Sequence, residues 1–249
     1  LRREKIEAVV GVGGYISVPV CVAAFLLRKP VFLQEQNVSV GIANRFLGRI
    51  SRKIFLGFPE AARYFSNDKV VVTGNPIRKE FFGPIPAYNA EGMTLLVLGG
   101  SQGAKAINQV ILQSLDRFPP SLKIVHQTGV SDEGPTQSAY KTLRPGRATA
   151  HAFITDMVSA MAEATLVVSR SGAVTVSELV QVGRPCILVP FPRQGQNDQT
   201  DNARWLERNG AGVVVEQGEG FKERFQAAWD QVFKRESLTK MAESFSALR

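Results

Sequence analysis

The sequence predicts an α/β protein made of two Rossmann-like domains, whose parallel sheets face each other across a cleft. Short apolar segments alternate with helix-like segments along the 249 residues, which is typical of βαβ units. Several apolar segments end in glycine-rich turns, as strands do when they lead into a helix. A stretch rich in proline and glycine, residues 76–92, separates two such series.

In the first series, a helix of small residues is expected over residues 19–27. Another helix is expected from Ala43 as far as Ile54, because apolar residues recur there at spacings of three and four. Its other faces carry Arg45, Arg49 and Arg52. Strands are expected at residues 6–11, 30–37, 53–58 and 69–74.

The second series begins with a strand that ends at Leu98 and is followed by a glycine-rich turn. A charged helix is expected to end the chain, from about Lys222 to Leu248. Further strands are expected at residues 123–129, in the segment 148–154 with its end near Ile154, and at 165–169, 185–192 and 211–216. The predicted division is residues 1–83 for the first domain, 84–92 for the linker and 93–249 for the second domain.

The composition limits the classes of partner. The formal charge of +8 favours anionic partners such as phosphorylated ligands or an acidic membrane surface. Nucleic acid is not expected, because the basic residues are dispersed and lack interleaved aromatics. The longest apolar run, residues 18–27, is shorter than the ~20 residues of a membrane-spanning helix. Cys21 and Cys186 are expected to be buried thiols.

No metal and no cofactor are expected. The sequence has no cluster of Cys and His at the spacing of metal ligands, and no Asp-x-Asp motif that would hold a diphosphate through a divalent cation. A bound diphosphate is therefore expected to be neutralised by helix N-termini and an arginine.

Three glycine-rich turns follow predicted strands and are the candidate phosphate-binding loops. They are GVGGYIS from Gly11, GGSQGAKAIN from Gly99 and SRSGAVTVSE from Ser169. Glycine lets the backbone approach a ligand closely, and the following helix start presents free N–H groups to an anion. Each turn alone is equally consistent with a simple strand–helix connection, whereas three at corresponding positions favour a nucleotide or diphosphate ligand.

Polar residues near these turns have two interpretations each. Glu178 is either a carboxylate for ribose hydroxyls or a surface glutamate. Arg78 is either a phosphate ligand or a solvated linker arginine. Five polar residues after the strand at 185–192 either bind sugar hydroxyls or cap the next helix: Gln196, Asn197, Asp198, Gln199 and Asn202. The basic helix around Arg45 faces either anionic lipid or solvent.

Taken together, ten segments resemble the MurG family of peptidoglycan N-acetylglucosamine transferases, from about Val9 to Glu216. They are GVGGYIS, LQEQNVSVGIANR, GFPEA, VTGNPIR, LGGSQGAKAIN, HQTG, FITDM, SRSGAVTVSEL, PCILVPFP and DQTDNA. The resemblance implies the GT-B fold and an inverting transfer of N-acetylglucosamine from UDP-N-acetylglucosamine to lipid I, which forms lipid II. It also implies a peripheral position on the cytoplasmic face of the bacterial cell membrane.

The resemblance assigns roles to residues that match the family's motifs. For the sugar donor they are Asn37, Arg78, Ser101 at the diphosphate, Ile154 at the uracil, the loop residues Ala173, Val174, Thr175, Val176 and Ser177, Glu178 at the ribose, and Gln199 at the N-acetylglucosamine. The first glycine loop is assigned to the acceptor lipid through Gly11, Gly13, Gly14 and Tyr15.

The sequence also departs from the family pattern. A further glycine loop whose histidine is the candidate general base has no counterpart here, and neither His126 nor His151 matches it. The first domain is therefore expected to be incomplete and the C-terminal segment shortened, with these residues binding the sugar donor without transferring it. Asp198 and Val18 replace a Gln and a Gly found in family members.

Two other functions remain open from the sequence. One is a related lipid glycosyltransferase that uses another UDP-sugar and a diacylglycerol acceptor. The other is a binding module without catalytic activity.

Overall fold

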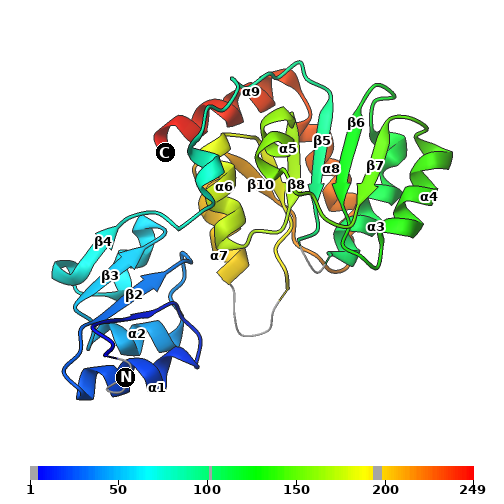
Figure 1. Ribbon diagram of the computed structural model, residues 1–249. Helices are drawn as coiled ribbons and strands as arrows, with labels where there is room; N and C mark the ends of the chain where they lie inside the picture. Colours follow the sequence, from blue (N-terminus) through cyan, green and yellow to red (C-terminus); the bar gives the residue numbers. More distant parts are fainter. Residues whose placement is uncertain (1–4, 101–102, 193–197) are drawn as a thin grey trace.

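The structure is a computed structural model that describes residues 5–100, 103–192 and 198–249 (Figure 1). In this part of the chain the strands form two parallel sheets. The first has the strand order β1-β2-β3-β4 and the second the order β10-β9-β8-β5-β6-β7. The predicted class, two α/β domains with parallel sheets, is confirmed. The exact domain limits stay a prediction.

The N-terminal sheet has its helices directly after its first two strands. Its strands are β1 (Val9–Gly11), β2 (Val31–Glu35), β3 (Lys53–Leu56) and β4 (Val70–Val72). The helices are α1 (Ser17–Leu26) and α2 (Ile42–Gly48), followed by the 3-10 turns η1 (Pro59–Tyr64) and η2 (Asn67–Lys69). A further 3-10 turn, η3 (Lys79–Phe82), packs against the C-terminal domain, where Phe81 is fully buried. Cys21, Leu33, Leu47 and Ile54 are fully buried between helices and sheet.

The helix expected to run from Ala43 to Ile54 is shorter than the prediction. Helix α2 ends at Gly48, and Ile54 belongs to β3. The backbone N–H and the hydroxyl of Ser51 both bond to the carbonyl oxygen of Leu47, which closes the last turn. The apolar spacing was misleading because residues of the loop and of β3 are buried in the same core.

The C-terminal sheet has the strand order of a Rossmann fold, with its first strand β5 beside its fourth strand β8. Its strands are β5 (Thr94–Leu98), β6 (Lys123–Gln127), β7 (Ala148–His151), β8 (Leu166–Ser169), β9 (Cys186–Leu188) and β10 (Gly212–Val214). Its helices are α3 (Lys105–Gln113), α4 (Glu133–Leu143), α5 (Met157–Glu163), α6 (Ala173–Val182), α7 (Asp198–Arg208), α8 (Phe221–Val232) and α9 (Arg235–Ser244), with the 3-10 turns η4 (Leu115–Arg117) and η5 (Phe245–Ala247).

Helices cover both faces of this sheet, so its strands are apolar on both sides (Figure 1). Leu95 and Val97 pack with α3, α4 and α8 on one face. Leu96 and Leu98 pack with α5, α6 and α7 on the other. Both cysteines are free and buried, as predicted.

Two elements of the C-terminal domain differ from the sequence-based expectation. Helix α4 was not predicted, because Gly134 and Pro135 resemble a turn; both lie in its first turn, where proline is tolerated. The single terminal helix is in fact two helices, since Lys234 adopts an extended backbone (φ −128°, ψ 137°) between α8 and α9.

The predicted linker is packed against the C-terminal domain. The guanidinium group of Arg184, which is 2% exposed, donates to the carbonyl oxygens of Pro86 and Ala162 at 2.8 and 2.7 Å. The hydroxyl of Tyr88 donates to the carbonyl oxygen of Thr165 at 3.0 Å. Hydrogen bonds therefore fix the segment that leads into β5.

A buried hydrogen-bonded chain lies behind the first loop of the C-terminal sheet. The Asn108 amide nitrogen donates to the Thr128 carbonyl and to the Asp132 carboxylate, at 3.0 and 2.7 Å. Its oxygen therefore accepts from His126 Nε2 at 3.0 Å, and His126 Nδ1 accepts from the hydroxyl of Tyr140 at 2.7 Å. Burial lowers the pKa of His126 to about 3, so the imidazole stays neutral in the folded protein.

This buried histidine predicts a pH-dependent stability. The unfolded chain binds a proton at His126 near pH 6.5, whereas the folded chain does so only near pH 3. The stabilisation is therefore complete above pH ~6.5 and is lost progressively as the pH falls toward ~3. Urea unfolding is expected to show that the unaltered chain loses about 2 kcal/mol more between pH 7 and pH 5 than His126→Gln does. The matched control His151→Gln alters an exposed histidine. Equal losses in the unaltered chain and in His126→Gln would contradict this account.

Candidate functional site at the seam between the two sheets

The candidate site lies at the carboxyl edge of the C-terminal sheet. Strands β5, β6 and β7 extend the sheet in one direction, whereas β8, β9 and β10 extend it in the other, and in such sheets ligands bind beside the loops that follow the two central strands, here β5 and β8. The loops are residues 99–104 after β5 and residues 170–172 after β8. Both were predicted as phosphate-binding turns, and the sheet brings them side by side because Leu98 pairs with Ser169.

The loop after β5 depends on glycine at Gly100 and Gly103, which have φ of 75° and 76°. A Cβ on Gly103 would lie 2.5 Å from the carbonyl oxygen of Thr128, so this glycine also permits close packing against the loop after β6. The loop leads into α3, whose first backbone N–H groups have no partner within the helix. Ser101, the predicted diphosphate contact, lies outside the described residues.

The loop after β8 ends at Gly172, which precedes α6 and adopts an extended conformation. Ala173, Val174 and Thr175 form the first turn of α6, where backbone N–H groups are free to bind an anion. The side chain of Val176 is fully buried in the core, so a contact from this residue must come from its backbone. Val174 is exposed and Thr175 half-buried.

Arg78, the residue before η3, forms an ion pair with Glu178 of α6, and η3 itself packs against α6. The Nη2 and Nε atoms of Arg78 lie 3.0 and 3.3 Å from Glu178 Oε1. The Glu178 side chain is only 9% exposed, whereas that of Arg78 is 46% exposed. Burial raises the pKa of the Glu178 carboxyl, and Arg78 offsets part of this rise. Glu178 is therefore not a surface glutamate, and Arg78, although exposed, is bound to its carboxylate.

Asn75 makes a second bridge beside this ion pair. Its amide nitrogen donates to the Gln36 carbonyl oxygen at 2.9 Å and to Ser177 Oγ at 3.0 Å. A Cβ on Gly57 would overlap the Asn75 amide at 2.2 Å, so only glycine leaves room for it. Ser177 was predicted as part of the nucleotide loop, and here it contacts the opposite domain.

Asn202 makes a third bridge and is completely buried. Its Oδ1 accepts from the Val38 N–H at 2.9 Å. Its Nδ2 donates to Asn37 Oδ1 at 3.0 Å and to the Ser171 carbonyl at 3.2 Å. Asn202 therefore holds the two domains together and is not a sugar ligand, which corrects one of the two sequence-based interpretations. Next to it, Ser39 Oγ donates to the carboxylate of Asp201.

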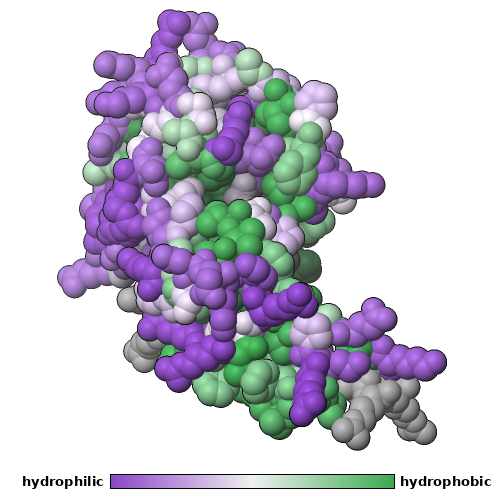
Figure 2. All heavy atoms as spheres, turned by 90° about the vertical axis from the view of Figure 1, so that its left-hand side faces the viewer, coloured by the Kyte–Doolittle hydropathy of each residue, from purple (hydrophilic) through white to green (hydrophobic). Residues whose placement is uncertain are grey.

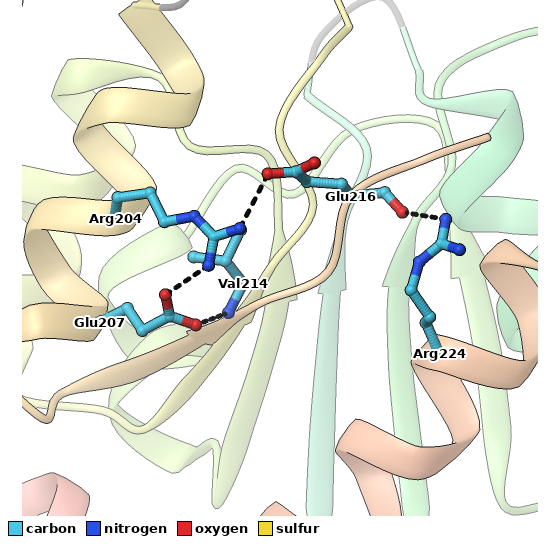
Figure 3. Close-up of polar contacts among 5 residues, drawn as sticks. All are labelled: Arg204, Glu207, Val214, Glu216 and Arg224. Atoms are coloured by element: carbon cyan, nitrogen blue, oxygen red, sulfur yellow. Dashed lines mark hydrogen bonds and ion pairs between the residues drawn. The ribbon is translucent and has the colours of Figure 1, made fainter.

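Helix α7, which carries Asn202, is fixed by a network on its outer side (Figure 3). Arg204 contacts the carboxylates of Glu207 and Glu216 at 2.6 and 2.8 Å, and these hydrogen bonds raise its pKa. Glu207 in turn accepts the Val214 N–H at 2.9 Å. This network ties α7 to β10 and thereby keeps the inner side of α7 against the N-terminal domain.

The other predicted contacts to the sugar donor flank the seam. Ile154 follows β7, and its N–H donates to Gln127 Oε1 at 2.9 Å. The next residues, Thr155 and Asp156, line a cavity of about 560 Å³ together with Arg78 and Glu80. Gln199 lies in the first turn of α7, with its Oε1 accepting the Phe191 N–H at 3.0 Å.

The glycine loop assigned to the acceptor follows β1 in the N-terminal sheet. Gly13 and Gly14 have φ of 95° and 74°, and Tyr15 is 75% exposed. Gly11 is needed for packing, because a Cβ there would lie 2.9 Å from Cys21 Sγ and Leu33 Cδ2.

A buried carboxylate at the end of β2 was not singled out from the sequence. Glu35, which is 3% exposed, accepts from the Asn37 N–H at 2.9 Å and from Asn44 Nδ2 at 2.8 Å. Burial raises its pKa, and these hydrogen bonds offset part of the rise. In the sequence, the only indication of this buried carboxylate was its position between the amide residues of LQEQN at the end of a predicted strand. The carboxylate thus fixes the backbone of Asn37. Asn44, its other partner, lies beside the first glycine loop, because a Cβ built on Gly13 would be 3.6 Å from the Asn44 amide nitrogen.

His126 is excluded as a proton acceptor for a substrate, because it is fully buried and both ring nitrogens are bonded inside the core. Among the residues that the structure describes, no three His, Cys, Asp or Glu side chains gather to hold a metal ion.

Comparison with known proteins gives two family matches. Residues 94–248 match the glycosyltransferase family 28 C-terminal domain, and residues 1–56 match the corresponding N-terminal domain.

Individual proteins give closer matches. The chain is 44% identical over 220 residues to the UDP-N-acetylglucosamine–N-acetylmuramyl-(pentapeptide) pyrophosphoryl-undecaprenol N-acetylglucosamine transferase of Syntrophotalea carbinolica, covering 87% of this chain and 61% of the relative. The protein of the same name from Coxiella burnetii is 38% identical over 253 residues, covering 98% of this chain and 70% of the relative. The crystal structure of MurG from Acinetobacter baumannii superposes with a TM-score of 0.81 at 30% identity, covering 99% of this chain and 70% of that one.

Proposed function

Because this chain belongs to the MurG family within glycosyltransferase family 28, we propose that it binds UDP-N-acetylglucosamine at the seam between its two GT-B domains. The whole protein would transfer N-acetylglucosamine from this donor to lipid I. The chain spans 61% of the length of the Syntrophotalea relative, whose name states such a transfer. The observation that carries the proposal is the ion pair of Arg78 and Glu178, which places a cation and a buried carboxylate on α6, the helix that follows the glycine turn after β8.

Each part of a UDP-sugar has a complementary group at the seam. Glu178 offers a carboxylate that accepts hydrogen bonds from the ribose hydroxyls. The N-terminal turns of α3 and α6 offer free N–H groups to the diphosphate. Ile154 is proposed to contact the uracil, and the amide nitrogen of Gln199, whose oxygen accepts the Phe191 N–H, is proposed to donate to the N-acetylglucosamine.

In the proposed reaction a general base takes the proton of the muramyl C4 hydroxyl, whose oxygen bonds to the anomeric carbon as the bond to UDP breaks, which inverts that centre. Negative charge then develops on the diphosphate. The Arg78 side chain is 46% exposed and hydrogen-bonded to Glu178, and we propose that it turns from the carboxylate to the phosphate oxygens. A guanidinium group binds phosphate through two parallel hydrogen bonds. Binding of the ribose hydroxyls to Glu178 would release Arg78, which would then bind the diphosphate as its negative charge develops.

The role of Glu178 is tested by Glu178→Gln. The amide keeps the size of the side chain but accepts fewer and weaker hydrogen bonds from ribose hydroxyls, so the affinity for UDP is expected to fall about tenfold. Isothermal titration calorimetry of UDP with the 249-residue chain measures this change.

The matched control is Glu163→Gln, which alters an exposed glutamate on α5. This control is expected to leave UDP affinity unchanged. If the unaltered chain does not bind UDP, or if both variants bind it equally well, the proposed site is wrong.

We also propose that the N-terminal domain contacts an anionic membrane surface, which suits a polyprenyl-linked acceptor and a peripheral position on the cytoplasmic membrane face. Helices α1 and α2 pack together and expose the apolar side chains of Phe25, Leu26, Ile42 and Phe46. Apolar surface lies among hydrophilic side chains over this domain, in the lower half of Figure 2. No helix in the described ranges is long and apolar enough to cross a bilayer.

The basic residues of this surface are not those around Arg45 that the sequence suggested. Arg45 stacks on the Tyr64 ring at 4.2 Å and donates to the Val40 carbonyl, so it is engaged within the protein. Arg28, Lys29 and Arg52 instead surround Phe25 and Leu26 in a shallow pocket of about 590 Å³. Exposed apolar side chains ringed by basic residues are the combination that binds anionic lipid.

Sedimentation with lipid vesicles tests this surface. The double substitution Phe25→Glu and Leu26→Glu is expected to reduce binding to vesicles containing phosphatidylglycerol at least fivefold, because it removes apolar contact area and repels the anionic surface. Leu143→Glu is the control, because Leu143 is an exposed apolar residue on α4 of the C-terminal domain, and this variant is expected to bind the vesicles normally. Equal binding by all three proteins would contradict the proposal.

A further inference from the structure

The HQTG segment has no assigned role, yet one of its residues contacts both ends of the candidate nucleotide site. Gln127 is the last residue of β6, and it pairs with Leu98 of β5 on one side and with His151 of β7 on the other. Its side chain is buried, with 3% exposure. The residue therefore lies between the strand that leads to the diphosphate loop and the strand that leads to Ile154.

The backbone of Gln127 fixes the start of the diphosphate loop. Its carbonyl oxygen accepts the Gly99 N–H at 2.9 Å. A Cβ on Gly99 would lie 3.0 Å from this oxygen and 2.8 Å from the Ala104 nitrogen, so the loop is closely packed against the end of β6.

The side chain of Gln127 fixes the loop after β7. Its Oε1 accepts the Ile154 N–H at 2.9 Å. The strand itself ends at His151, so the sheet provides no partner for this N–H. A partly buried N–H left without a partner is costly, and the loop would move to satisfy it. Such a movement would shift Thr155 and Asp156, which line the cavity beside Arg78.

We propose that Gln127 is a positioning residue that sets the spacing between the base-binding and diphosphate-binding loops, and thereby the recognition of uridine diphosphate. This inference rests on the proposed function, because it requires a nucleotide to bind along both loops. Gln127 acts through Ile154 and the glycine loop rather than by touching the reacting atoms.

The chain provides a matched control in Gln137 of α4. Its Oε1 accepts the Ala150 N–H at 2.7 Å. Like the bond from Ile154 to Gln127, this is a hydrogen bond from a backbone N–H to a glutamine side-chain oxygen. Ala150 lies within the strand, four residues before Ile154. Gln127→Met and Gln137→Met each remove one such bond, and only the first acts on the base-binding loop.

The test measures UDP and ADP affinities of the 249-residue chain by calorimetry, together with thermal unfolding. Gln127→Met is expected to weaken UDP binding about tenfold and to reduce the preference for UDP over ADP. Gln137→Met is expected to leave the UDP affinity and the preference for UDP over ADP unchanged, while shifting the melting temperature about as much as Gln127→Met does. Gln127→Glu, which retains an oxygen acceptor for the Ile154 N–H, is expected to restore UDP affinity to within about threefold of the unaltered chain.

The outcomes separate the two proposals. Absence of UDP binding by the unaltered chain would overturn the proposed function and this inference together. UDP binding by the unaltered chain with equal affinities for Gln127→Met and Gln137→Met would overturn the inference alone. Failure of Gln127→Glu to restore binding would likewise overturn it, because the effect would then not depend on the bond to Ile154.

Discussion

The seam between the two sheets depends on polar side chains that find their hydrogen-bond partners only when both domains are in place. Asn202 uses three hydrogen bonds, two to the N-terminal domain and one to the loop after β8. A buried polar group without a partner costs about 1–3 kcal/mol, so separating the domains is unfavourable until water replaces these bonds. Phe58 and Trp205 pack edge to face beside them, with ring centroids 4.8 Å apart. The seam thus fixes which residues of the first domain face the second.

This constraint links the fold to the proposed chemistry. Parallel strands end at one edge, so the glycine loops after β5 and β8 meet there. The seam then adds Arg78 and Asn37, which the C-terminal sheet cannot provide by itself. Glu178 is buried by the same packing, which raises its pKa, and Arg78 favours its charged form. A buried carboxylate with a movable cationic partner suits a ligand that carries both hydroxyls and a diphosphate.

Much of the fold was predictable from the sequence, because strands buried on both faces are short apolar runs between glycine turns. The helix expected over 43–54 failed because apolar periodicity does not separate a helix from a loop and strand in one core. The candidate positions of Arg78 and Glu178 were also predictable, but their pairing was not, since it links residues 100 positions apart. Asn202, Asn75 and Gln127 were missed as bridging residues because an isolated amide in a sequence carries no sign of its partner. The expected role of Ser101 lies outside the described residues and stays a prediction.

The central claim is that Arg78, in the segment that connects the two sheets, supplies positive charge to a nucleotide held by the C-terminal domain. The most direct measurement compares the affinities of Arg78→Gln for UDP and for uridine, which has the same base and sugar but no phosphate. The account predicts that UDP binding weakens at least about tenfold, while uridine binding does not weaken, because Arg78 no longer occupies Glu178. An equal loss of affinity for both ligands would contradict the account, since Arg78 would then act only by supporting the structure of the site.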